Sequence, residues 1–234
     1  MTEIAQAFAT AWRLIASGDA ALLEIVALSL RVTGAAVALA ALIGLPLGAL
    51  LGVTRFPGRR VITVALNTGM ALPPVVVGLA LYLLFSRSGP LGGWELLFTP
   101  TAMVVAQAAL VTPIIASLSR QTIEDLAREY DEQLRAFGAT RARAAATLLV
   151  EARYSLPTAL LAGLGRAIAE VGAVMIVGGN IAHVTRTMTT TIVLHSSRGD
   201  TALALALGIL LVALAAAVNA ATEGVRAAAR RVGA

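Results

Sequence analysis

Five apolar runs, each close to twenty residues long, constrain this chain more than any other feature of its sequence. They lie near Val32–Val53, Val64–Phe85, Thr101–Leu118, Ser155–Val177 and Thr201–Thr222. A helix needs about twenty apolar residues to cross the hydrocarbon core of a bilayer, and each run is too long and too apolar for a barrel strand. A helix also satisfies its own backbone hydrogen bonds where water is absent. The sequence therefore predicts an all-α membrane protein with about five transmembrane helices.

The composition supports this class and excludes several others. Charged residues make up 13% of the chain, whereas soluble domains average about 25%. The net charge of +5 comes with scattered arginines and no lysine, so we expect a membrane protein and no nucleic-acid partner. The chain has no cysteine and two histidines, so disulfides are excluded and no metal site is expected.

No motif for ATP chemistry or catalysis is present in the sequence. A phosphate-binding loop of the form G-x-x-x-x-G-K-[ST] requires a lysine, which this chain lacks. A zincin helix and a nucleophile elbow are also missing. We therefore expect no catalytic residue and no cofactor in this chain, and any ATP-driven step requires a separate subunit.

The arginines outside the apolar runs predict the orientation in the membrane. Those on one side outnumber those on the other, which are Arg13, Arg87, Arg186 and Arg198. The larger set is Arg55, Arg59, Arg60, Arg120, Arg128, Arg135, Arg141, Arg143, Arg153, Arg226, Arg230 and Arg231. The arginine-rich side is expected to be cytoplasmic, which places the N-terminus outside and the C-terminus inside.

This orientation divides the chain into three parts. Residues 1–31 are expected to form an extracytoplasmic segment, residues 32–222 the transmembrane domain and residues 223–234 a cytoplasmic tail. The start of the first span is open, because Ala21–Leu30 is also apolar and Arg31 interrupts a longer helix. At the outer edge of the membrane, Arg31 can extend its charge to the headgroups.

A charged segment, about residues 123–150, interrupts the apolar pattern on the predicted cytoplasmic side. Apolar residues recur in it at steps of three and four, which predicts one face of an amphipathic helix. They are Ile123, Leu126, Ala127, Tyr130, Leu134 and Phe137. Gly138 is expected to end this helix in the left-handed conformation, and Thr140 to cap a second helix, Arg141–Leu149. The simplest alternative is a charged loop that only anchors the topology.

Within this segment, Glu132-Gln133-Leu134-Arg135-Ala136-Phe137-Gly138-Ala139 resembles the E-A-A-x-x-x-G loop of binding-protein-dependent ABC importer permeases. Gln133 and Leu134 replace the two alanines of that motif, and Glu151 stands where the family often has a proline. The resemblance implies a permease fold in which this segment is the cytoplasmic coupling helix that docks on an ATPase. Glu132, Gly138, Ala139 and Arg141 would then contact the ATPase.

Two further segments resemble one branch of that family. Leu72–Gly92 is similar to a region of molybdate and tungstate permeases, and Gly165–Asp200 is most similar to the tungstate type. Molybdate permeases usually carry G-E-F-G where this chain has Ala169-Glu170-Val171-Gly172. The resemblance implies a prokaryotic cell-membrane homodimer that imports tungstate by alternating access. Its partners would be two ATPase subunits that bind ATP and Mg, an extracytoplasmic oxyanion-binding protein and membrane lipid.

Other functions stay open at this point. Within the class, the cargo is alternatively molybdate, sulfate or another small oxyanion. From other classes, the chain is alternatively an ion-coupled secondary carrier or a membrane scaffold that transports nothing. A secondary carrier of the inverted-repeat type predicts an internal repeat with paired broken helices, and the sequence shows no repeat.

Arg166 and Glu170 are charged residues inside the fourth apolar run. Each charge costs on the order of 2.5–3.5 kcal/mol at mid-membrane on insertion scales. Four residues apart on one helix, they are expected to neutralise each other in part. The pair is interpreted either as a structural ion pair between helices or as a gate that attracts an anion weakly and releases it.

Polar and helix-breaking residues in other spans are further candidates for the substrate pathway. Pro73-Pro74 lies mid-span and removes two amide donors, which predicts a kink that serves packing or a gate. Asn67 and Thr68 lie nearby as polar lining. Gln107, in the third span, is interpreted as an interhelical hydrogen-bond partner rather than a ligand.

The hydroxyl-rich loop after Gly178-Gly179-Asn180 is expected outside. Asn180, Thr185 and Arg186 are the candidate contacts for a binding protein there. A polar loop without a partner is the alternative.

Overall fold

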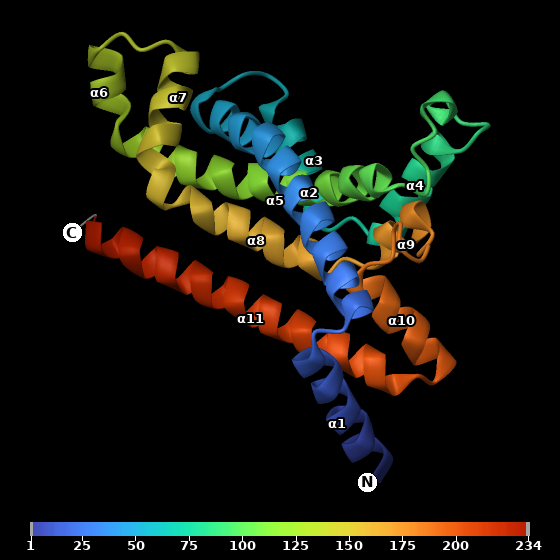
Figure 1. Ribbon diagram of the computed structural model, residues 1–234. Coiled ribbons are helices and arrows are strands. Elements are labelled where there is room, and N and C mark those ends of the chain that lie inside the picture. The colour runs from blue at the N-terminus through green and yellow to red at the C-terminus, as the bar shows by residue number, and fades with distance from the viewer. Residues whose placement is uncertain (1, 233–234) are drawn as a thin grey trace. The chain divides into compact units, whose positions relative to one another are not determined.

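The computed structural model describes residues 2–232, and every regular element in this range is helical (Figure 1). The side chains of residues 2–4, 6–7, 131, 135, 225–226 and 228–232 lie outside the description. The α-helices are α1 (Thr2–Ser17), α2 (Ala20–Val53), α3 (Arg59–Met70), α4 (Pro74–Phe85), α5 (Pro100–Glu129), α6 (Asp131–Ala136), α7 (Arg141–Glu151), α8 (Leu156–Ile168), α9 (Gly172–Gly178), α10 (Met188–Arg198) and α11 (Thr201–Val232). Two short 3₁₀ helices are η1 (Gly92–Trp94) and η2 (Ala152–Tyr154).

The structure confirms the all-α class, and its long or interrupted helices overlap the five predicted apolar runs. Three helices, α2, α5 and α11, are each long and apolar enough to cross a bilayer. Two interrupted pairs, α3 with α4 and α8 with α9, bring the number of candidate spans to five if each pair counts as one. The break between α3 and α4 has a local cause. Pro73 and Pro74 supply no amide hydrogen, and Pro74 occupies the first position of α4.

Several helices extend beyond the predicted runs. α2 begins at Ala20 and continues through Arg31, whose side chain is exposed. The expected boundary between residues 31 and 32 therefore falls inside a helix. The third span continues as α5 to Glu129, so that the first helix of the charged segment is largely its extension. At the other end, α11 continues to Val232, so the expected tail is helical as far as the description extends.

The chain folds as two compact units, each assembled from separate stretches of sequence. The first comprises Met1–Ala35, Pro73–Gln107 and Ile168–Ala217. Its core gathers α1, the start of α2, α10 and α11 around the buried side chains of Leu22, Met188 and Leu207. In the same unit α4 packs closely on α9, where a Cβ at Gly78 would lie 2.8 Å from the Cα of Ala173.

The second unit comprises Ala36–Leu72, Ala108–Ala167 and Val218–Ala234. Here the C-terminal half of α2 packs on α5 through glycines spaced four residues apart, Gly44, Gly48 and Gly52. A Cβ at Gly48 would lie 2.5 Å from the carbonyl oxygen of Ala116. Small residues at this spacing let two membrane helices approach until their backbones touch. Gly48 therefore sets the separation of α2 and α5.

We expect the substitution Gly48→Ala to destabilise the protein by about 1–3 kcal/mol, because the added methyl group overlaps a backbone carbonyl that cannot rotate away. Gly34→Ala is the matched control on the same helix, since nothing lies within 4 Å of a Cβ at Gly34. Thermal unfolding midpoints in one detergent measure both changes. Equal midpoints for the two variants would show that the contact at Gly48 does not limit the packing.

Candidate functional site

The charged segment contains the end of α5 and two further helices, α6 and α7, which are joined at a glycine as the sequence predicts. The predicted first helix is not continuous, because a turn at Tyr130 separates α5 from α6. Gly138 follows α6 with a φ of +59°, the left-handed conformation. The amide of Ala139 donates to the carbonyl of Leu134 at 3.0 Å, which is the bond that closes a Schellman helix end. Thr140 then caps α7, since its hydroxyl accepts from the amide of Arg143 at 3.3 Å. Both predictions about the local structure are confirmed.

One face of the charged segment is buried and the other is exposed. Ile123 on α5 and Leu148 on α7 are almost fully buried in a core that also includes Ala49 of α2. Glu132, by contrast, is exposed. Phe137, the last residue of the predicted apolar face, is 86% exposed beside Gly138. Its amide still donates to the carbonyl of Gln133 at 3.0 Å, so the residue continues the helical path while its ring is left uncovered by the described residues.

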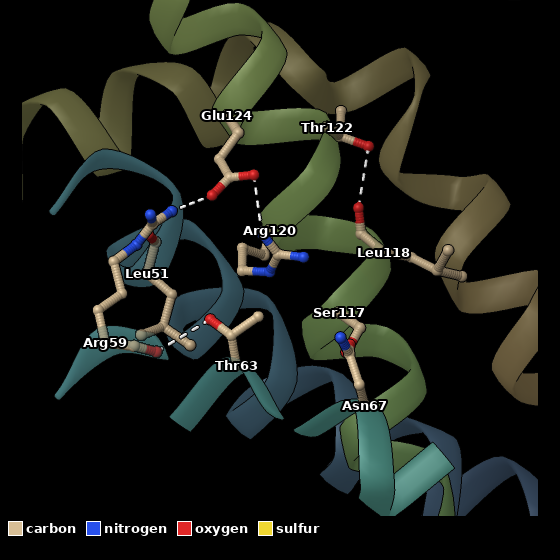
Figure 2. Close-up of polar contacts among 9 residues, drawn as sticks. All are labelled: Leu51, Arg59, Thr63, Asn67, Ser117, Leu118, Arg120, Thr122 and Glu124. Carbon is tan, nitrogen blue, oxygen red and sulfur yellow. Dashed lines mark hydrogen bonds and ion pairs between the residues drawn. The ribbon is translucent and has the colours of Figure 1, made fainter. Parts of the chain in front are cut away.

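A group of charges joins the start of this segment to the start of α3. Figure 2 shows the carboxylate of Glu124 between two guanidinium groups. One oxygen pairs with Arg59, and the other lies 2.7 Å from Nη1 of Arg120. Arg59 also donates from Nε to the carbonyl of Leu51 at the end of α2, at 2.8 Å. The three side chains are 12–28% exposed, so solvent screens these contacts only in part.

Arg120 depends on Glu124 for its interactions. Its Nε is buried and has no hydrogen-bond acceptor within the described part of the chain. An unsatisfied buried donor is costly, and a charge-assisted hydrogen bond is worth more than a neutral one. Glu124 therefore joins the start of α3 and α5 in a single electrostatic cluster, which we call the Glu124 cluster.

A cavity of about 620 Å³ lies between the charged segment, the end of α2 and the end of α5. Ala139 and Arg141, two of the residues expected to contact the ATPase, line it together with Arg55 and Arg128. Glu124 is its acidic lining residue and is already paired with two arginines. The cavity is therefore polar and predominantly positive.

The candidate pathway residues Asn67 and Thr68 lie near the end of α3, and both are exposed. Asn67 accepts a hydrogen bond from the hydroxyl of Ser117 on α5 at 3.3 Å (Figure 2). Pro73 and Pro74 do not kink a continuous helix, because α3 has ended at Met70 and α4 begins at Pro74. The structure thus places a full break where the sequence predicts a kink.

The expectation that Arg166 and Glu170 share one helix face is wrong. α8 ends at Ile168 and α9 begins at Gly172, so that Glu170 lies in the break between them. Glu170 is 3% exposed and accepts a hydrogen bond from the amide of Ala173 at 3.0 Å. Its carboxylate therefore caps the first turn of α9, where a negative charge is favourable.

The hydroxyl-rich loop is held mainly by its own threonines. Thr185 is fully buried, and its hydroxyl accepts from the amide of Ile181 at 2.9 Å. Burial excludes its side chain from contact with a docked protein, which corrects that part of the sequence prediction. Arg186 donates to the carbonyl of Asn180 at 3.4 Å, and contact of these two residues with a binding protein stays a prediction.

Two features of the site were missed by the sequence interpretation. The ion pair between Arg59 and Glu124 joins residues 65 positions apart, and no local pattern signals it. The series Gly44, Gly48, Gly52 was readable as a repeated G-x-x-x-G spacing.

Within the described residues, no three His, Cys, Asp or Glu side chains gather as a metal site would require.

Comparisons with known proteins identify the family to which the sequence is similar. The family described as "Binding-protein-dependent transport system inner membrane component" matches residues 44–231. The "Probable anion ABC transporter permease protein" of Haloferax volcanii is 46% identical over 85% of this chain and 88% of its own length. The "Tungstate uptake system permease protein TupB" of Peptoclostridium acidaminophilum is 39% identical over 94% of this chain and 96% of its own. A protein with the same name from Campylobacter jejuni is 37% identical over 70% and 69%.

We expect Glu124→Gln to lower the free energy of unfolding by about 1–3 kcal/mol, because it removes a charged acceptor from two partly buried arginines. Asp125→Asn is the matched control, since Asp125 is the adjacent carboxylate and is exposed. Thermal unfolding in detergent at constant salt compares the two. The double variant Arg120→Gln/Glu124→Gln should lose less than the sum of its single changes. Additive losses would contradict a shared cluster.

Proposed function

This chain belongs to the family of binding-protein-dependent transport system inner membrane components, and on that premise we propose that it is the membrane subunit of an ATP-driven importer of tungstate. The assignment of tungstate as the cargo rests on the similarity to a tungstate uptake permease along nearly the whole of both chains. The membrane location follows from the family and from the long apolar helices.

The proposed partners are an ATPase and an extracytoplasmic binding protein for the anion. We place the ATPase on the charged segment, with Glu132, Gly138, Ala139 and Arg141 as contacts. The exposed ring of Phe137 supports this placement, because an exposed aromatic side chain beside a rigid turn is typical of a protein contact. We place the binding protein at Asn180 and Arg186, on the side opposite the arginine-rich loops.

The second unit offers a route for coupling ATP hydrolysis to the membrane helices. Leu148 of α7 and Ile123 of α5 lie in one buried core, so a displacement of α7 moves α5 with it. The Glu124 cluster and the tight contact at Gly48 then pass the displacement to α2 and the α2–α3 loop. Close-packed contacts shift between discrete arrangements rather than deform continuously, as alternating access requires.

The pathway in this proposal runs past the two helix interruptions. Broken helices at membrane depth are tolerated where they are buried or line a cavity, and they often mark substrate sites. Pro73, Pro74, Asn67 and Thr68 lie at or near the first interruption. Glu170 lies within the second, and Arg166 lies in the last turn of α8 before it. Two copies of the chain, each with an ATPase subunit bound, would enclose one pore.

Uptake by the reconstituted complex tests the cargo. The chain, its ATPase and its binding protein are incorporated into liposomes, and accumulation of tungstate, molybdate or sulfate is measured by mass spectrometry of the metal or by radioactive sulfate. We expect ATP-dependent uptake of tungstate at concentrations well below those needed for molybdate. Equal uptake of all three anions would replace tungstate by a general oxyanion cargo. Uptake that persists without ATP or the ATPase would contradict the importer itself and favour an ion-coupled carrier.

The turn at Gly138 provides a test of coupling. We expect Gly138→Val to lower ATP-driven uptake several-fold, since a β-branched residue at a φ of +59° costs about 1–2 kcal/mol. Gly138→Asn should retain most uptake, because asparagine tolerates this conformation. No atom lies within 4 Å of a Cβ at this position, so backbone strain is isolated from steric overlap. Equal uptake by the two variants would show that the turn geometry is not required.

A further inference from the structure

A second cavity, of about 450 Å³, lies where α2 ends and α3 begins. Four arginines line it: Arg55 in the α2–α3 loop, Arg59 and Arg60 at the start of α3, and Arg120 on α5. Phe56 and Thr63 complete the lining. All six residues belong to the second compact unit. We call this feature the arginine cavity.

The arginine cavity holds more positive charge than the protein neutralises. Glu124 pairs with Arg59 and Arg120 (Figure 2). Arg55 and Arg60 are exposed, and neither forms an ion pair or side-chain hydrogen bond with any other described residue. Repulsion among four guanidinium groups disfavours their gathering, and an anion that enters the cavity relieves it.

The chemistry of the donors selects the type of anion. A guanidinium group presents a planar fork of N–H donors that matches two oxygens of a phosphate or similar oxyanion. The hydroxyl of Thr63 donates to the carbonyl of Arg59 at 3.0 Å, so it fixes the first turn of α3 on which Arg59 and Arg60 lie. We propose that the arginine cavity binds an oxyanion of the phosphate class, presented by the headgroup of an anionic lipid or as a free anion.

The surroundings of the cavity favour the lipid as the source. It lies at the end of α2, a helix long and apolar enough to span the membrane, on the side where arginines accumulate. The side chains of Phe56, Val61 and Ile62 next to the arginines are 37%, 71% and 38% exposed. Apolar side chains beside a basic pocket match a lipid, whose phosphate and acyl chains lie next to each other. The proposal rests on the membrane location and not on which anion is transported.

The first arm of the test measures lipid binding by the full chain in detergent, using native mass spectrometry with phosphatidylglycerol or phosphatidylcholine. We expect wild type to bind phosphatidylglycerol selectively. The double variant Arg55→Gln/Arg60→Gln should weaken that binding by on the order of tenfold, since each arginine near a lipid surface contributes roughly one tenfold step or less. Arg55→Lys/Arg60→Lys keeps the charge but not the planar fork, so it should recover only part of the binding.

The matched control is Arg143→Gln/Arg153→Gln, which removes the same charge from exposed arginines of the same unit that do not line the cavity. The second arm titrates inorganic phosphate against the chain in phosphatidylcholine nanodiscs by calorimetry. Loss of phosphatidylglycerol selectivity in the cavity variant alone supports the lipid as the source. Phosphate binding that is lost in the cavity variant alone supports a free anion. Equal changes in both double variants would overturn the site, because net charge alone would then account for binding. Unchanged binding of phosphatidylglycerol and of phosphate in the cavity variant would also overturn it, because the four arginines would then bind neither ligand.

Discussion

The contact between Gly48 of α2 and the backbone of α5 is the constraint on which the second unit depends. With a Cβ excluded at this position, α2 and α5 lie close together, and Arg59, which donates to the carbonyl of Leu51 at the end of α2, also pairs with Glu124 on α5. The same approach places Gly52 beside Ile123, one residue before Glu124. A wider separation of the helices would move Arg59 away from Glu124 and break the connection between the membrane and the charged segment. The ion pair between Arg59 and Glu124 therefore depends on the close packing of α2 and α5.

The arginines of this chain serve more than topology. Twelve of them on the predicted cytoplasmic side follow the positive-inside rule, but those near the start of α3 have different contacts in the structure. Arg59 and Arg120 hold Glu124 in a partly buried cluster, where the local dielectric strengthens the interaction. Arg55 and Arg60 are left facing a cavity without an acidic partner among the described residues. The use of arginine instead of lysine fits both tasks, since a guanidinium group bonds to several oxygens at once.

The sequence predicted those parts of the structure that local physics determines. Span positions follow from the length of apolar runs, and Gly138 and Thr140 follow from the chemistry of helix ends. The break before α9 was not predicted, because Ala169, Glu170 and Val171 carry no strong breaking signal and Glu170 acts as a cap only once the helix has ended. Burial of Thr185 and the pairing of Arg59 with Glu124 depend on distant segments meeting, which no local pattern encodes.

In the proposed importer, an ATPase docks on the exposed side of the charged segment and transmits its motion through α5. Photocrosslinking tests it most directly, with p-benzoylphenylalanine in place of Phe137, which is 86% exposed, and in place of Trp94, which is 69% exposed on the expected opposite side of the membrane. We expect irradiation of the assembled complex to join the ATPase subunit to position 137 and not to position 94. An ATPase adduct at position 94, or none at position 137 in a complex that hydrolyses ATP, would contradict it.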